Sequence, residues 1–127
     1  MAKVMVVDDA QADLRFMESI LQSAGHQVVS YADGAQLEEK LATEQPDVLL
    51  LDIVMPNRSG YEILRAIRKD DRTKSTPVVL VTSKNQESDR VWGKRQGADD
   101  YVTKPFTPEQ LLGAVRRLAR HTGERSG

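Results

Sequence analysis

Five polar residues of this chain stand directly after short strand-like runs, and their side chains could together do phosphoryl chemistry. They are Asp8, Asp9, Asp52, Thr82 and Lys104. If the preceding runs are neighbouring parallel strands, their carboxyl ends lie along one edge of a sheet, where such folds bind ligands. That edge would hold three carboxylates, one hydroxyl and one ammonium group.

Three crowded carboxylates repel one another, and a bound cation allows all of them to stay ionised. Oxygen ligands without His or Cys favour Mg²⁺, which binds carboxylates, water and phosphate oxygens. A carboxylate can also attack phosphorus and form an acyl phosphate. We therefore expect Asp52 to be the nucleophile, with Lys104 and Thr82 stabilising the transferred phosphoryl group.

Each residue also has an ordinary structural interpretation. An Asp after a strand commonly belongs to a turn or caps a helix, and a Thr at a strand end reflects β-propensity. A Lys-Pro pair after a strand is usually a surface loop. The joint placement of the five residues at four strand ends favours a functional interpretation over these separate explanations.

The composition indicates a globular protein and excludes several classes of function. The chain has 127 residues, enough for one domain with a real core, and 39% of them are hydrophobic. The net charge of −1 provides no basic field for nucleic acid or anionic lipid. Cysteine is absent, and no apolar run approaches the ~20 residues that span a bilayer. No export signal precedes the first strand, so we expect a cytoplasmic protein without membrane insertion.

Strand-like runs alternate with segments of helical period. The expected strands are 3–7, 27–31, 47–52, 77–82 and 100–103. The expected helices are 11–24, 34–44, 59–69, 86–97 and 107–120. Five βα repeats predict an α/β fold with a doubly wound parallel sheet, helices on both faces and right-handed crossovers. We expect one domain over residues 1–121 and a frayed tail over 122–127, which offers no apolar anchor.

The motifs at these strand ends resemble those of the CheY-like receiver domains of bacterial response regulators. The resemblance covers roughly residues 3–120 and rests on several motifs, which are Val6–Asp9, Leu51–Pro56, Gly60, Val81–Ser83 and Tyr101–Phe106. It implies a flavodoxin-like sheet of five parallel strands in the order 2-1-3-4-5. It also implies a signalling protein that accepts a phosphoryl group and is not a conventional enzyme.

The resemblance assigns a role to each matching residue. Asp52 would accept a phosphoryl group from a phosphohistidine on a sensor histidine kinase. Asp9 and Asp52 would ligate Mg²⁺ directly, Asp8 mostly through water, and Val54 through its backbone carbonyl. Lys104 would pair with the phosphoryl oxygens.

The resemblance also implies a switch. Thr82 would hydrogen-bond the phosphoryl group and move inward, and Tyr101 would turn in behind it. The Lys104–Pro105 peptide bond would be cis, which costs only about 0.5–1 kcal/mol before proline.

Two further positions flank the expected path of a water that attacks the phosphoryl group. Val54, two residues after Asp52, cannot orient that water through its side chain. Lys84, two residues after Thr82, could contact the phosphoryl group or point into solvent. We expect these residues to tune the lifetime of the phosphorylated state and dephosphorylation not to be especially fast.

The output would act in trans, on a partner at the face formed by 86–97, 100–103 and 107–120. The stretch 92–98 is similar to stand-alone regulators of type IV pilus chemosensory systems, so control of motility is one expected pathway. The single tryptophan, Trp92, is expected in the core or at its boundary, as is usual for a helical Trp. A phosphate sink for a shared kinase and an unphosphorylated docking module are the alternatives within the family.

Two other protein classes share parts of the pattern. A flavodoxin-type cofactor binder needs a hydroxyl- and glycine-rich loop after the first strand. The loop here, residues 8–13, holds three aspartates and would repel phosphate. A phosphohydrolase with an aspartate nucleophile would want a second acid where Val54 stands.

Overall fold

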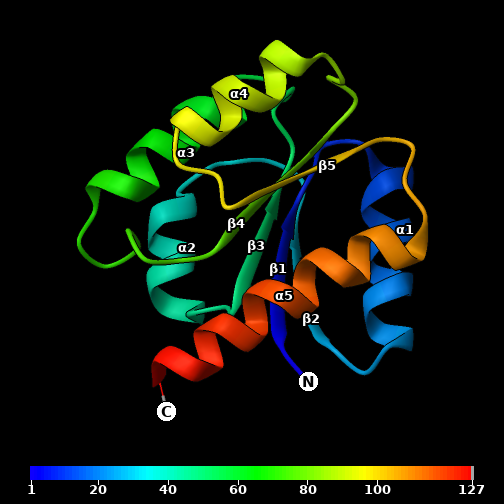
Figure 1. Cartoon of the computed structure of the whole chain (residues 1–127). Helices are drawn as coiled ribbons and strands as arrows, with labels where there is room; N and C mark the ends of the chain where they lie inside the picture. Colours follow the sequence, from blue (N-terminus) through cyan, green and yellow to red (C-terminus); the bar gives the residue numbers. More distant parts are fainter. Residues whose placement is uncertain (127) are drawn as a thin grey trace.

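The computed structural model describes the backbone of residues 1–126 and the side chains of residues 1–119. Within these residues, strands and helices alternate along the chain, each strand followed by a helix (Figure 1). The strands are β1 (Lys3–Val7), β2 (Gln27–Tyr31), β3 (Val48–Leu51), β4 (Val78–Thr82) and β5 (Asp100–Thr103). The helices are α1 (Gln11–Ser23), α2 (Leu37–Glu44), α3 (Gly60–Lys69), α4 (Glu87–Arg95) and α5 (Pro108–Ser126).

All strands pair in parallel, in the order β2-β1-β3-β4-β5. The doubly wound α/β fold and the strand order predicted from the sequence are therefore confirmed. Helices α1 and α5 cover one face of the sheet, and α2, α3 and α4 lie on the other (Figure 1). The order reverses between β1 and β3, so the carboxyl ends of these two strands form the switch point at which such sheets bind ligands.

Alternate residues of each strand belong to different core clusters. Val4 and Val6 of β1 pack with buried residues of α1 and α5. Met5 and Val7 pack with buried residues of α2 and α3. Because both faces are covered, β3 and β4 are apolar almost throughout. The loops at the carboxyl edge therefore extend from a sheet that is packed on both faces.

Local signals explain where several helices begin and end. Ser59 caps α3, where its hydroxyl accepts a hydrogen bond from the Glu62 N–H at 3.2 Å. Thr107 and Gln110 form a reciprocal capping box at the start of α5. Gly25 follows α1 with a φ of 89°, the left-handed conformation that favours glycine.

Some boundaries differ from the predicted ones. Helix α2 begins at Leu37 and not at residue 34, since Gln36 has a left-handed φ of 53°. Helix α5 extends to Ser126, beyond the predicted end at 120. Side chains from residue 120 onward and the whole of residue 127 lie outside the described part, so the domain boundary at 121 and the frayed tail stay predictions.

Helix α4 departs from the expectation for Trp92. Gly93 is its buried residue, whereas Val91 is 44% and Trp92 47% exposed. A β-carbon at Gly93 would lie 2.8 Å from Leu80 Cδ1, so α4 rests on the sheet through the glycine and its large apolar residues face outward. The prediction that Trp92 lies in the core or at its boundary is therefore wrong. Among the described residues, no helix combines the length and apolar character that crossing a bilayer requires.

Candidate functional site

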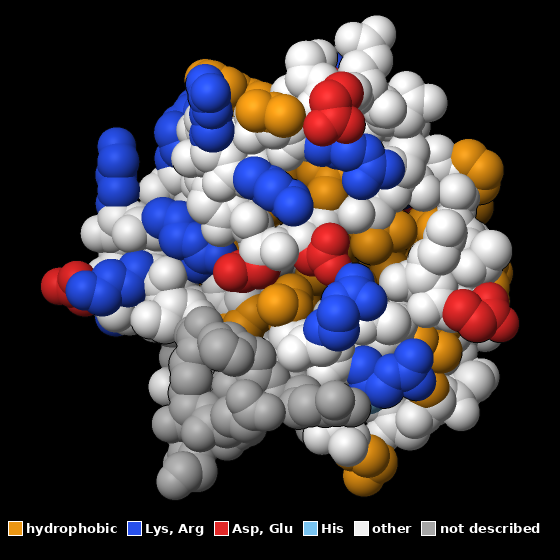
Figure 2. Space-filling model, in the orientation of Figure 1, with side chains coloured by type: hydrophobic (Ala, Val, Ile, Leu, Met, Phe, Trp, Pro, Cys, Tyr) orange, Lys and Arg blue, Asp and Glu red, His pale blue; other side chains and the backbone are white. Residues whose placement is uncertain are grey.

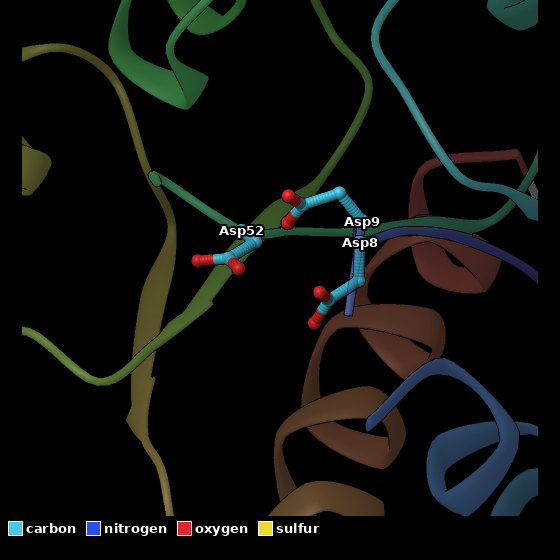
Figure 3. Close-up of side chains that lie close together, drawn as sticks. All are labelled: Asp8, Asp9 and Asp52. Carbon is cyan, nitrogen blue, oxygen red and sulfur yellow. The ribbon is translucent and has the colours of Figure 1, made fainter. Parts of the chain in front are cut away.

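Three carboxylates meet at the carboxyl edge of the two central strands (Figure 3). Asp8 and Asp9 follow β1, and Asp52 follows β3. These strands are neighbours, with Val7 paired to Leu51, so the residues after them come together. One carboxylate oxygen from each residue lies within 4.8 Å of the others. The predicted convergence of these three residues is present in the structure.

The three carboxylates differ in their environment. Asp8 is completely buried, Asp52 is 6% exposed and Asp9 is exposed. Oδ1 of Asp8 accepts a hydrogen bond from the Ala10 N–H at 2.9 Å. Oδ1 of Asp52 accepts one from the Val54 N–H at 3.3 Å. These bonds hold two carboxylates in position, and the exposed Asp9 leaves the cluster open to solvent.

Lys104, after β5, supplies the positive charge. Its Nζ lies 2.7 Å from Asp8 Oδ2, 2.9 Å from Asp13 Oδ2 and 3.3 Å from Asp52 Oδ2. Its side chain is only 13% exposed, and the Lys104–Pro105 peptide bond is cis. The structure therefore places the predicted lysine between the carboxylates that follow β1 and β3.

Burial and pairing act in opposite directions on these groups. Burial raises the pKa of the Asp8 carboxyl, and the hydrogen bond from Lys104 opposes that rise. Burial lowers the pKa of Lys104, but the hydrogen bonds to Asp8 and Asp13 and the negative charges of Asp52 and Asp8 together outweigh it, and the pKa lies above its usual value. The lysine therefore remains an ammonium group beside the carboxylates at neutral pH.

The backbone of Lys84 connects the two predicted switch residues. Thr82 is fully buried at the end of β4, and its Oγ1 accepts a hydrogen bond from the Lys84 N–H at 3.4 Å. Tyr101 is 6% exposed, and its hydroxyl donates to the Lys84 carbonyl at 2.8 Å. The guanidinium of Arg90 lies 5.2 Å from the Tyr101 ring centroid and donates to Thr103 Oγ1 at 2.7 Å. Tyr101 is therefore held in an inward orientation from both sides.

The two residues predicted to tune the lifetime lie beside the site with exposed side chains. Val54 is 56% exposed as a residue, and Lys84 is also exposed. The structure shows backbone contacts for both residues. The Val54 N–H donates a hydrogen bond to Asp52, and the Lys84 carbonyl accepts one from the Tyr101 hydroxyl. Their side-chain roles and the role of the Val54 carbonyl stay predictions.

Two contacts of the site were not anticipated from the sequence. Asp13 pairs with Lys104, and Arg90 covers Tyr101. Asp13 stands in the first turn of the helix that directly follows β1, which was a usable signal because that turn lies at the ligand-binding edge. For Arg90 the sequence offers no comparable signal, since an arginine on a helix is ordinarily solvated.

The ligand set suits a hard cation. Asp8, Asp9 and Asp52 offer carboxylate oxygens, and the chain contains no cysteine. Such oxygen-only sites select Mg²⁺, Ca²⁺ or Mn²⁺ over softer metals. The acidic cluster can therefore hold a divalent cation.

Comparison with known proteins agrees with this geometry. The profile of the family described as "Response regulator receiver domain" matches residues 4–116. The protein PilH of Pseudomonas aeruginosa is 44% identical over 93% of this chain and 98% of its own length. PilG of the same organism is 39% identical over 90% of this chain and 84% of its own length.

Solved structures show the same fold. The chemotaxis protein CheY4 of Vibrio cholerae has a TM-score of 0.85 at 35% identity, over 93% of this chain and 98% of that one. The receiver domain of the Francisella response regulator 1452 has a TM-score of 0.89 at 29% identity, over 96% and 99% of the two chains. The expected resemblance to CheY-like receivers is confirmed, and this chain belongs to the response regulator receiver domain family.

Proposed function

We propose that Asp52 accepts a phosphoryl group from a phosphohistidine of a sensor histidine kinase in the presence of Mg²⁺. The observation that carries this proposal is the gathering of Asp8, Asp9 and Asp52 at one edge of the sheet, with the ammonium of Lys104 paired to Asp8 and Asp52. A surface turn does not require a nearly buried carboxylate such as Asp52 beside two further acids and a largely buried lysine.

The roles of the side chains follow from their positions. An Asp52 oxygen would form the bond to phosphorus as the bond between phosphorus and the histidine nitrogen breaks. Asp8, Asp9, Asp52 and the Val54 carbonyl would hold Mg²⁺, which supplies positive charge for the phosphoryl oxygens. Lys104 and Thr82 would donate hydrogen bonds to those oxygens. The chain thereby contributes residues to its own phosphorylation and dephosphorylation.

The phosphoryl group would bias a two-state element. If Thr82 moves toward the phosphoryl oxygens, its contact with the Lys84 N–H changes. The carbonyl of the same residue, Lys84, accepts the hydrogen bond from the Tyr101 hydroxyl, so the change can reach Tyr101. Tyr101 lines a cavity of about 400 Å³ between α4, β5 and α5, with Arg90, Thr103, Glu109 and Arg117 also on its wall. A change at Asp52 would therefore reach the face formed by α4, β5 and α5.

We further propose that this face binds an output protein in trans. Lys and Arg side chains on the side shown in Figure 2 are interspersed with acidic and apolar ones, a mixture that suits a protein partner better than nucleic acid. We place its output in type IV pilus chemosensory control in the cytoplasm, and the similarity to PilH and PilG supports the pathway. A phosphate sink for a shared kinase is the alternative output.

The test is phosphorylation of the full chain by radiolabelled acetyl phosphate. We expect Mg²⁺-dependent incorporation of label in the wild type and none in Asp52→Asn. Asp71→Asn is the matched control, because Asp71 is an exposed acid that pairs with Lys74 away from the site. Labelling that persists in Asp52→Asn, or a wild type that stays unlabelled, would refute the proposal. Phosphotransfer profiling against candidate kinases would then identify the donor.

The lifetime of the phosphorylated state is a separate test of Val54 and Lys84. Neither exposed side chain offers a carboxylate or amide to orient an attacking water. We expect slow loss of label after acetyl phosphate is removed. Loss within seconds, measured by acid quench without any phosphatase, would contradict this.

A further inference from the structure

Building on the proposed phosphorylation of Asp52, we propose that Asp13 is a positioning residue that restrains Lys104 and thereby opposes phosphoryl binding. The salt bridge between Asp13 and Lys104 is a feature of this chain that the general chemistry of the site does not require. Asp13 acts through the lysine and does not itself touch the phosphoacceptor in the contacts that the structure gives.

The distances show how the ammonium is shared. Lys104 Nζ lies closer to Asp8 and Asp13, at 2.7 and 2.9 Å, than to Asp52, at 3.3 Å. An ammonium group has three N–H donors, and the structure gives it three carboxylate acceptors. A phosphoryl group on Asp52 brings several anionic oxygens that need donors. Asp13 occupies one donor that those oxygens would otherwise receive.

Lys104 can release its contact with Asp13 at a lower free-energy cost than its contact with Asp8. Its side chain is 42% exposed, whereas that of Asp8 has no exposed surface. Water can solvate the Asp13 carboxylate when the lysine leaves it, but Asp8 would be left as an unpaired buried charge. Competition for the lysine therefore falls between Asp13 and the phosphoryl group.

Charge acts in the same direction. Asp13 adds a fourth carboxylate near a site that must accept an anionic group, and like charges disfavour binding of the anion. The alternative explanation is that Asp13 only stabilises the first turn of α1. It stands in the first turn of that helix, where an acid is favourable and where Ala10 provides no side-chain cap. The two explanations differ in whether the effect of Asp13 depends on Lys104.

The experiment measures binding of beryllofluoride, a phosphoryl mimic, to the full chain in Mg²⁺ by calorimetry. Loss of a partly exposed ion pair predicts that Asp13→Asn binds about two- to fivefold more tightly than the wild type. Asp13→Glu, which keeps the charge, should restore an affinity near that of the wild type. Asp33→Asn is the matched control, since Asp33 is an exposed acid in the loop after β2 whose carboxylate accepts a hydrogen bond from the Ala35 N–H. It should leave the affinity unchanged.

A double-mutant cycle separates positioning from helix stabilisation. In a Lys104→Met background, Asp13→Asn should tighten binding less than in the wild-type background, because the restrained ammonium is gone and only the loss of the Asp13 charge still acts. An unchanged or weaker affinity in Asp13→Asn, or an equal gain in both backgrounds, would overturn the inference. A wild type that shows no Asp52-dependent binding would overturn the proposed function together with this inference. A wild type that binds normally while Asp13→Asn matches it would overturn the inference alone.

Discussion

The ammonium of Lys104 lies 2.7 Å from Oδ2 of Asp8, a carboxylate without exposed surface. The two residues come from opposite ends of the chain and meet because their strands end at one edge of the sheet. A buried carboxylate is costly unless a cation and hydrogen bonds compensate its charge. Lys104 therefore serves folding as well as the proposed chemistry.

Replacing Lys104 by Met should lower the free energy of unfolding by about 3 kcal/mol, near the low end for breaking a buried ion pair. Millimolar Mg²⁺ should recover part of that loss, because a cation held by the folded carboxylates stabilises the folded state. Urea denaturation with and without Mg²⁺ measures both effects. Lys74→Met, which removes an exposed pair with Asp71, is the control and should change stability little. A loss that Mg²⁺ leaves untouched would contradict a shared cation site.

Gly60 permits close packing against the backbone of Asp52. A β-carbon there would contact the carbonyl oxygen of Asp52 and lie 2.7 Å from the Cα of Ile53. Gly60→Ala should therefore lower the free energy of unfolding by about 1–3 kcal/mol and weaken beryllofluoride binding, because the Asp52 backbone must shift.

Gly113 supplies the matched comparison for Gly60. It lies in α5, and a β-carbon there meets only the Arg117 side chain at 3.4 Å. Gly113→Ala should raise the free energy of unfolding by about 0.5–1 kcal/mol through helix propensity. Chemical denaturation of both variants checks the pair, and equal effects of the two substitutions would be inconsistent with crowding at Gly60.

His26 should make stability depend on pH. Its Nδ1 accepts a hydrogen bond from the Ala2 N–H at 3.1 Å, which requires the neutral ring. Burial, and then the nearby N-terminal amino group and Arg116, lower the pKa of His26 below the usual 6.5. As the pH falls, the unfolded chain therefore binds a proton at His26 before the folded protein does. The contribution of His26 to stability is complete above the usual, unfolded-state pKa, and it is lost as the pH falls through the folded-state pKa.

The measurement for His26 is the free energy of unfolding between pH 7.5 and about 5. The wild type should lose stability over this range, and His26→Gln should show a shallower dependence. An NMR titration of the His26 ring gives an independent reading. A normal or raised pKa in that titration would contradict the expectation.

Arg90 should hold Tyr101 in its inward orientation. The guanidinium covers the ring and bonds to Thr103, while burial raises the pKa of Tyr101 to about 12. Removing Arg90 takes away a cation–π contact of about 0.5–1 kcal/mol and one wall of the cavity. Arg90→Ala should therefore shift the orientation of Tyr101 outward in the unphosphorylated protein.

NMR of ring-labelled tyrosine measures that shift of Tyr101. Arg95→Ala is the control, because it removes the same charge from an exposed position on the same helix. We expect the Tyr101 ring signals to move toward solvent-exposed values only in Arg90→Ala. Identical spectra for the two variants would show that Arg90 does not restrain the ring.

The fold and the centre of the site were largely predictable from the sequence. Apolar runs such as 48–51 form strands covered on both faces, and the intervening segments carry helical periodicity with readable caps at Ser59 and Thr107. Parallel strands present their carboxyl ends at one edge of the sheet. The strand pattern therefore predicts that Asp8, Asp52 and Lys104 lie close together.

The contacts of long or exposed side chains depended on the tertiary structure. Trp92 faces outward because α4 packs through Gly93, which no helical period in the sequence reveals. Asp13 reaches Lys104, and Arg90 covers Tyr101, through contacts between elements that are far apart in the sequence. Backbone periodicity determines which residues share a strand or a helix, whereas the packing of one element against another decides which flexible side chains meet. The sequence therefore determined which residues could carry the proposed phosphoryl chemistry, and the three-dimensional packing decided which neighbours restrain the lysine and the tyrosine.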